Sequence, residues 1–326
     1  MSKLYPLVFH PIFKERVWGG RRLETLYKKP LPSGAIIGES WEISDRPGDE
    51  SIIANGEFSG KSIRWLMENF EKDLLGDAKP SQNGRFPLLV KILDAGEDLS
   101  LQVHPPAAVA AQLGGEPKTE MWYVTYAEPG SALYAGLNPG IGRSDFEKKL
   151  KEGTLQECLK RFEVKQGDAI FIPSGRVHGL GKGIVLFEIQ QNSDTTYRVY
   201  DWNRVGLDGK PRQLHIDQAL KSIDFQDYSA NLIQTKYSQS QTFKIRYLVD
   251  DRLFRVNGCK VRRGARFKLS SDTVHIIGVL KGTLGVSYEN LSVELNCGQF
   301  CLIPAVVKQV SFTAQKQTEF LHIQAF

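Results

Sequence analysis

Short hydrophobic runs, separated by clusters of Gly, Pro, Asn and Asp, recur through most of the chain. Runs of this length that are rich in Val, Ile, Phe and Tyr are typical of β-strands. Clear examples are PLLVKIL (87–93), EMWYVTY (120–126), DAIFIP (168–173) and GIVLFEIQ (183–190). A chain of many short strands with few helices is typical of a mainly β protein built as a barrel or sandwich.

Helical spacing of hydrophobic positions is confined to a few stretches. Residues 61–76 show it over four turns and end in a glycine, which predicts one helix. Ser144 and Thr154 are each followed three residues later by Glu, so we expect two short helices between 144 and 162. A further helix is predicted over 215–223.

Two segments far apart in the chain resemble each other. KQGDAIFIPSGRVHGL (165–180) and NCGQFCLIPAVVKQV (296–310) both contain a Gly, five residues, and then a Pro. The first copy continues to His178, whereas the second has Gln309 at that place. We therefore expect two related β-barrel modules, of which only the first is equipped for chemistry.

The boundary between the modules is predicted from polarity alone. The polar stretch YSQSQT (237–242) is the best candidate for a link. We expect a catalytic domain over residues 1–238 and a C-terminal β module over 239–326 without metal ligands.

The segment LQVHPP (101–106) places Gln102 and His104 two residues apart in a strand-like run. Residues i and i+2 of a strand point to the same side, so these side chains should project together. Taken alone, the pair is more simply explained as the wet face of a half-buried strand. The wider pattern of the chain has to decide between that explanation and a metal site.

The spacing G-x5-P-x-G-x2-H, which ends at His178, is the second sequence motif of cupin barrels. In cupins the first motif supplies two ligands from one strand and a Glu from the next. Gln102, His104 and Glu120 fit that arrangement. We therefore predict two cupin-type (jelly-roll) barrels, the first with one metal ion. Such a mixed nitrogen and oxygen set suits Zn2+, and it can also hold Mn2+ or Fe2+.

Longer blocks carry a more specific resemblance. They are VWGG (17–20), GESWEIS (38–44), FPLLVKILDAGEDLSLQVHP (86–105), KTEMWYV (118–124), IPSGRVHGL (172–180), EIQQNSDTTYRVYDWNR (188–204) and LHIDQAL (214–220). With these blocks the chain resembles the type I mannose-6-phosphate isomerases (phosphomannose isomerases) of the cupin superfamily, in their shorter bacterial form. The resemblance implies a metal-dependent aldose–ketose isomerase that interconverts mannose 6-phosphate and fructose 6-phosphate.

The resemblance also implies roles for individual residues. One zinc ion per chain would be held by Gln102, His104, Glu120 and His178. The residues matching catalytic groups of the family are Lys118, Glu188, Asp194 and Arg198. The residues matching the substrate pocket are Trp18, Glu39, Lys91 and Ser100.

The reaction must open the sugar ring and move a proton between C2 and C1 through a cis-enediol. Glu188, Asp194 and Lys118 are the candidate acids and bases, and we slightly prefer Glu188, which should point inward from the strand after His178. Arg198 stays charged and suits a phosphate or an enediolate. Without the resemblance, Asp194 and Arg198 would be read as an ordinary i,i+4 ion pair.

Two positions depart from the family pattern. Pro117 stands where longer members often have a histidine, so an acid–base role of that histidine cannot apply here. Arg176, beside His178, is unusual at its position. It could contact phosphate, but we predict that it lies on the surface.

Composition limits the other functional classes. The 326 residues are 41% hydrophobic and carry a net charge of +5 without a dense basic run, which argues against nucleic-acid binding. No stretch is long and apolar enough for a membrane span, and no secretory segment is evident. Four sparse cysteines predict reduced thiols, and so a cytoplasmic protein. We expect a monomer or weak homodimer acting on a small sugar phosphate.

Three alternatives remain open from the sequence. A cupin oxygenase would share the metal ligands but would not need Lys91, Lys118 and Arg198 together. A non-catalytic sugar-phosphate-binding cupin would keep the pocket without the reaction. An isomerase for a different sugar would keep all of these residues.

Overall fold

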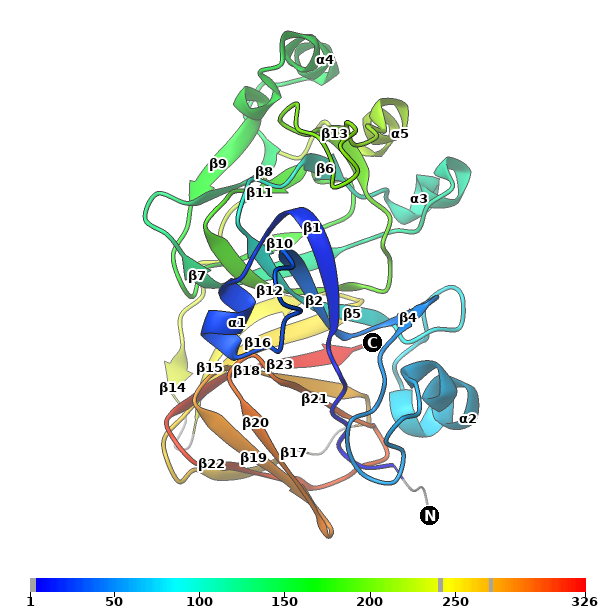
Figure 1. Ribbon diagram of the computed structural model, residues 1–326, viewed down its shortest axis with the longest axis vertical. Helices are drawn as coiled ribbons and strands as arrows, with labels where there is room; N and C mark the ends of the chain where they lie inside the picture. The colour runs from blue at the N-terminus through cyan, green and yellow to red at the C-terminus, as the bar shows by residue number, and fades with distance from the viewer. Residues whose placement is uncertain (1–3, 240–242, 270–271) are drawn as a thin grey trace. The chain divides into compact units, whose positions relative to one another are not determined.

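The computed structural model describes residues 4–239, 243–269 and 272–326, and strands dominate in it (Figure 1). The chain forms two compact units, each defined by the contacts within it. We call residues 13–40 and 91–233 the first barrel, and residues 4–12, 41–90 and 234–326 the second barrel. The mainly β prediction with cupin-type barrels is confirmed.

The first barrel is formed by two sheets. One has the order β1 (Ile12–Gly20), β2 (Ile37–Ile43), β5 (Leu88–Ala95), β12 (Ile184–Gln191), β7 (Glu120–Ala127) and β10 (Ala169–Ile172). The other has the order β13 (Tyr197–Tyr200), β6 (Leu101–Val103), β11 (His178–Leu180), β8 (Ala132–Leu137) and β9 (Leu159–Glu163). Its helical segments are α1 (Arg22–Tyr27), α3 (Ala107–Ala110), α4 (Arg143–Glu152) and α5 (Ile216–Ser222), with 3-10 turns at Ala111–Leu113 and Leu155–Cys158.

Two hydrophobic clusters explain how the first barrel positions its strands. One cluster joins Leu93 and Val124 of the first sheet to Leu133 and Leu180 of the second, which makes it the barrel interior. The other joins the opposite face of the second sheet to α4, α5 and the 3-10 turn, and it includes Leu101 and Val103. Because strand residues alternate in direction, this burial turns the neighbouring Gln102 away from the helices.

The second barrel repeats the two-sheet design. One sheet has the order β14 (Ser238–Gln239), β15 (Phe243–Asp250), β16 (Phe254–Val261), β23 (Thr318–Ala325), β18 (His275–Lys281) and β21 (Phe300–Ile303). The other has the order β17 (Arg266–Leu269), β22 (Val310–Ala314), β19 (Thr283–Tyr288) and β20 (Leu291–Asn296). A small hairpin, β3 (Asp45–Arg46) and β4 (Asp49–Glu50), and helix α2 (Ile63–Leu75) belong to the same unit.

The sequence repeat corresponds to a structural repeat. Gly167 and Gly298 both have positive φ, 91° and 77°, a conformation that glycine adopts without strain. Each precedes the last strand of its sheet, which is β10 beside β7 in one case and β21 beside β18 in the other. The similarity predicted from the Gly-to-Pro spacing is therefore present at the level of strands.

The helix predictions have mixed outcomes. Helix α2 begins after Ser62, whose hydroxyl accepts a hydrogen bond from the Trp65 amide, and α5 matches the predicted 215–223 segment. The prediction of two capped helices between 144 and 162 was wrong in detail. The N-cap of α4 is Gly142, whose amide donates to the Asp145 carboxylate, and only a 3-10 turn without a side-chain cap follows Thr154.

The domain boundary remains a prediction. Residues 41–90 group with the C-terminal residues by compactness, an interleaving that the proposed division at 238/239 did not include. Part of the suggested link, residues 240–242, lies outside the described residues. Among the helices that the structure describes, none has the length and apolar character needed to cross a membrane.

Candidate active site

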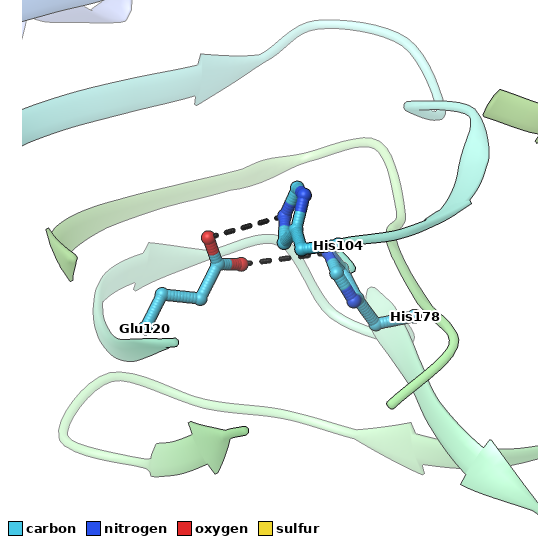
Figure 2. Close-up of side chains that lie close together, drawn as sticks. All are labelled: His104, Glu120 and His178. Atoms are coloured by element: carbon cyan, nitrogen blue, oxygen red, sulfur yellow. Dashed lines mark ion pairs between the residues drawn. The ribbon is translucent and has the colours of Figure 1, made fainter. Parts of the chain in front are cut away.

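His104, Glu120 and His178 converge inside the first barrel, and their ligand atoms all lie within 4.8 Å of one another (Figure 2). His104 Nε2 is 3.4 Å from Glu120 Oε2, and His178 Nε2 is 3.4 Å from Glu120 Oε1. Glu120 opens β7, His178 opens β11, and His104 follows β6. The strand and turn positions that suggested these residues thus bring them together.

Backbone carbonyls fix the orientation of both imidazoles. His104 Nδ1 donates to the carbonyl of Thr195 at 2.7 Å, and His178 Nδ1 donates to that of Arg176 at 2.9 Å. Each ring therefore turns an unprotonated Nε2 toward Glu120. Metal-binding histidines are commonly held in this way by a second hydrogen bond.

The buried atoms at the centre fit a metal ion. His104 Nε2 and both carboxylate oxygens of Glu120 are buried and make no hydrogen bond within the described residues. Burial lowers the pKa of His104 to about 3 and also lowers that of His178. Burial alone would raise the pKa of Glu120, but Lys118 and the imidazoles hold it well below its usual value. Neutral imidazoles and an ionised carboxylate are the forms that ligate metals.

Gln102 lies beside this group. Its Nε2 is 3.2 Å from His178 Nε2, and its Oε1 accepts a hydrogen bond from Ser100 Oγ at 3.3 Å. The two ends of an amide have nearly the same shape, so a half-turn of the group presents the oxygen to the centre instead. Gln102 can thus serve as a fourth, neutral ligand.

A pocket of about 520 Å³ adjoins the centre. Eight of the residues predicted for catalysis or substrate binding line it together with Gln102: Trp18, Glu39, Lys91, Ser100, Lys118, Glu188, Asp194 and Arg198. Residues from six separate segments of sequence are therefore gathered at one place. Their individual roles stay predictions.

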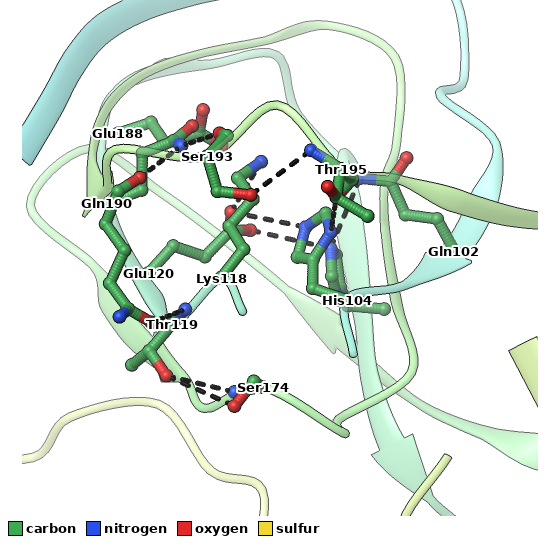
Figure 3. Close-up of polar contacts among 12 residues, drawn as sticks. Gln102, His104, Lys118, Thr119, Glu120, Ser174, Glu188, Gln190, Ser193 and Thr195 are labelled. Atoms are coloured by element: carbon green, nitrogen blue, oxygen red, sulfur yellow. Dashed lines mark hydrogen bonds and ion pairs between the residues drawn. The ribbon is translucent and has the colours of Figure 1, made fainter. Parts of the chain in front are cut away.

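Lys118 is the cation nearest the centre, with Nζ 3.0 Å from Glu120 Oε2 (Figure 3). Burial alone would lower the pKa of Lys118, but Glu120, Glu188 and Asp194 together raise it above its usual value. Lys118 is therefore a fixed positive charge in this arrangement.

Lys91 and Glu188 form a second buried pair, in which Nζ lies 3.4 Å from Oε2. The other oxygen of Glu188 accepts a hydrogen bond from Trp122 Nε1 at 2.9 Å. Burial, followed by the charge of Glu120, raises the pKa of Glu188. A buried carboxyl group with a raised pKa is a candidate for proton transfer.

Arg198 lies on β13 directly opposite Gln102 of β6. Its Nη1 donates to the Gln213 carbonyl at 2.9 Å, and its buried Nε makes no hydrogen bond within the described residues. Burial lowers its pKa, and the nearby Arg212 adds to the effect. Asp194 contacts Lys91 at 3.9 Å, so the structure does not reproduce the simple Asp194–Arg198 pair that the i,i+4 spacing suggested.

Sequence reasoning missed several lining residues, among them Arg16, Trp122 and Arg212. Arg16, on β1 two residues before Trp18, binds both oxygens of Glu39, and strand alternation could have found it. Trp122 follows Glu120 at the same spacing on β7 and could have been found in the same way. Arg212 lies in a loop, held by two hydrogen bonds to Asp201, and no sequence pattern indicates it.

The prediction that Arg176 lies on the surface was wrong. Its side chain is 9% exposed and binds Asp227 through two hydrogen bonds, of 2.5 Å and 2.7 Å. It also donates to the Phe171 carbonyl and to Ser229 Oγ. Arg176 ties the turn before His178 to the segment that follows α5, so its contribution is structural.

Comparison with known proteins agrees with this site. The family model described as phosphomannose isomerase type I, catalytic domain, matches residues 7–134. A probable mannose-6-phosphate isomerase of Bacillus subtilis, GmuF, is 33% identical over 97% of this chain and 98% of its own. The chain belongs to the type I phosphomannose isomerase family. A second B. subtilis relative, the mannose-6-phosphate isomerase ManA, is 39% identical over 67% of this chain and 68% of its own.

The fold agrees with solved members of the family. The crystal structure of the mannose 6-phosphate isomerase from B. subtilis covers 99% of this chain at 30% identity, with a TM-score of 0.89. That structure is itself covered completely. As a phosphomannose isomerase by family, the chain is an enzyme, and the prediction of an isomerase rather than a cupin oxygenase is confirmed.

Proposed function

We propose that this phosphomannose isomerase uses one zinc ion to interconvert mannose 6-phosphate and fructose 6-phosphate through a cis-enediol. The observation that carries the proposal is the pair of carbonyl-oriented imidazoles that turn their Nε2 atoms toward the Glu120 carboxylate, with His104 Nε2 buried and without a hydrogen bond within the described residues. The names of the relatives supply the substrate.

The ligands of the ion would be Gln102, His104, Glu120 and His178. Two imidazoles, one carboxylate and one amide oxygen form a ligand set that suits zinc. Magnesium and calcium prefer sites in which every ligand is an oxygen, so this set argues against them. When bound, the ion would supply positive charge that polarises the sugar oxygens of the reacting end.

The cations of the pocket would hold the substrate. Arg16, Arg198 and Arg212 all line it, and a sugar phosphate brings a negative charge that they can pair with. We assign Arg198 the main contact because its Nε is buried without a hydrogen bond, whereas Arg212 is already bound to Asp201.

Glu188 would move the proton between C2 and C1. The carboxylate takes the proton from C2 of the open-chain aldose as O1 is protonated to give the enediol. It then returns the proton to C1 as the O2 hydroxyl loses its proton, so the net change moves one proton from C2 to C1 and one from O2 to O1. Trp122 and Lys91 hold the Glu188 carboxyl in place through its two oxygens. Lys118 would stabilise negative charge that develops on the sugar oxygens. Asp194, half exposed at the same pocket, remains the alternative base.

A coupled assay tests the proposal directly. Purified protein is assayed for formation of fructose 6-phosphate from mannose 6-phosphate, before and after treatment with a chelator, and again after adding zinc. We expect activity that the chelator removes and zinc restores. Activity that survives complete metal removal would refute the metal assignment. A folded, zinc-loaded protein without turnover would shift the assignment to another sugar or to a sugar-phosphate-binding protein.

We further propose a cytoplasmic monomer or weak homodimer. The four cysteines, Cys158, Cys259, Cys297 and Cys301, are all free thiols, as is usual in a reducing compartment. Light scattering during gel filtration measures the oligomeric state, and a stable higher oligomer would contradict this part.

A further inference from the structure

The second barrel contains two rows of polar side chains that cross its larger sheet. In one row Tyr247 of β15, Asn257 of β16 and His322 of β23 lie directly opposite one another. In the next row Asp250, Arg255, Gln324 and His275 lie opposite one another across β15, β16, β23 and β18. Paired residues of neighbouring strands share a face, so both rows point to the same side of the sheet.

This side is the interior of the second barrel. The adjoining row on the same face pairs Cys259 with Phe320, and the Phe320 ring stacks on Phe267 of the opposite sheet at 5.8 Å. The interior is thus hydrophobic further along the strands and polar only at the two rows. A cavity of about 440 Å³ opens at these rows, and Tyr247, Arg255, Asn257 and Gln324 line it.

The rows occupy the positions that form the active site in the first barrel. Ile172 and Ile303 each precede the proline of the sequence repeat. Ile172 pairs with Glu120, which also pairs with Gln190, whereas Ile303 pairs with His275, which also pairs with Gln324. His275 therefore stands at the position of the metal ligand Glu120. His322, two residues before Gln324, stands at the position of Glu188.

Two buried atoms at the rows make no hydrogen bond within the described residues: His275 Nε2 and Asn257 Oδ1. His275 is 4% exposed, and its Nδ1 forms a hydrogen bond of 2.7 Å with His322 Nε2. The other ring nitrogen of His275, Nε2, is the one left without a hydrogen bond within the described residues. A buried polar atom without a partner costs about 1–3 kcal/mol, and most such atoms are satisfied by water or a ligand.

The charges at the rows favour an uncharged ligand. Arg255 Nε donates to Asp250 at 2.9 Å, so the one guanidinium and the one carboxylate of the rows neutralise each other. Burial keeps both imidazoles neutral at pH 7, because it lowers the pKa of His275 to about 4 and that of His322 to about 3. No free carboxylate is left in these rows to attract a metal ion, and no unpaired cation is left to attract a phosphate.

We propose that the mouth of the second barrel binds a small uncharged polyhydroxylated ligand, a sugar of about hexose size. The amides of Asn257 and Gln324 can bond hydroxyl groups as donors and as acceptors. The Tyr247 ring, 61% exposed, offers a flat apolar surface at the rim. The volume falls within the range of about 300–1,000 Å³ that is usual for small-molecule sites.

Hydrogen–deuterium exchange of the full chain locates such binding. The probes are D-mannose and D-glucose at millimolar concentration, with inorganic phosphate and zinc as the comparison probes. We expect a hexose to protect peptides from β15, β16 and β23. Binding in the catalytic pocket would instead protect peptides from residues 91–103 and 118–124, so the two sites are read separately.

Variants identify the residues. Asn257→Ala and Tyr247→Ala should each lower the affinity for the hexose about tenfold, so that about ten times more hexose is needed for the same protection. Turnover of mannose 6-phosphate should stay unchanged. Tyr247 is exposed, so its replacement keeps the fold. Tyr288→Ala, at a half-buried tyrosine of β19 in the other sheet, is a control that should leave protection intact. No protection by either hexose, or protection of these strands by phosphate or zinc alone, would overturn the proposal.

Discussion

At the scale of single residues, His104 and His178 of the first barrel are oriented by backbone carbonyls that would not themselves be metal ligands. The carbonyls of Thr195 and Arg176 fix which nitrogen of each ring carries the proton. Arg176 is held in turn by Asp227. The position of His178 therefore depends on a buried ion pair in the same turn.

Removing a ligand should remove the metal and the activity together. His104→Ala or Glu120→Ala takes away a side chain that the remaining ligands cannot replace, so we expect at least a hundredfold loss of turnover and an equal loss of bound zinc. Metal content is measured by mass spectrometry on the same samples that are assayed. His10→Ala, at an exposed histidine, should change neither quantity.

Arg198→Ala should separate metal binding from turnover. Arg198 contacts the pocket and not the three central ligands, so zinc should remain while kcat/KM falls about a hundredfold or more. Arg143→Ala, at an exposed position, is the control for loss of an arginine. Near-normal turnover of Arg198→Ala with zinc bound would remove Arg198 from the mechanism.

The sequence predicts residues of this site wherever strand alternation alone decides their direction. Leu101 and Val103 are drawn into a hydrophobic cluster with α4 and α5, and Gln102 must then face the other side. Arg176 could not be placed in this way. Its partner Asp227 is 51 residues away, and nothing in a local pattern reports a contact over that distance.

At the scale of elements, the Arg176–Asp227 pair joins the turn before β11 to the segment that follows α5. Asp227→Asn leaves the Arg176 guanidinium buried without its counter-charge, which typically costs about 3–5 kcal/mol. Unfolding in urea should show this loss in the free energy of unfolding. Asp217→Asn, in the first turn of α5, is a control that should change stability little.

The first residues of the helices show that a capping motif in the sequence does not by itself fix where a helix begins. Ser62 caps α2 through its hydroxyl, which accepts a hydrogen bond from the Trp65 amide, although the helix was predicted from hydrophobic spacing and a final glycine. Ser144 is followed three residues later by Glu147, the pattern of a capping box, but the helix begins earlier because Asp145 accepts a hydrogen bond from the amide of Gly142. Two overlapping cap patterns compete there, and sequence alone does not say which one forms.

At the scale of the whole molecule, the imidazole pair of the second barrel should make stability sensitive to acid. The folded pKa of His275, about 4, lies below the value of about 6.5 in an unfolded chain. The unfolded state therefore binds the proton first, and stability falls as the pH drops from about 6.5 toward 4. For His275 alone the loss between pH 7 and pH 5 is about 2 kcal/mol.

Urea unfolding at several pH values, with metal removed, measures this dependence. His275→Gln should reduce the loss between pH 7 and pH 5 by about 2 kcal/mol, because Gln does not titrate, while the other buried histidines keep their contributions. His10→Gln should retain the full slope, since His10 is exposed. An unchanged slope in His275→Gln would show that other groups cause the acid sensitivity.

The division of the chain into units is the part of the fold that sequence reasoning reached least well. The repeat at 165–180 and 296–310 correctly indicates two related modules, because local turn chemistry repeats with it. It contains no information on residues 41–90, which join the second barrel through contacts with segments more than 140 residues later.

The same interleaving imposes an order on biosynthesis. Every residue of the first barrel has left the ribosome once Ile233 has emerged, whereas residues 41–90 must wait for partners that are translated later. Strand β23 lies between β16 and β18 but is made after both. While translation continues, the nascent chain thus exposes the unpaired edges of β16 and β18, the kind of surface that chaperones shield.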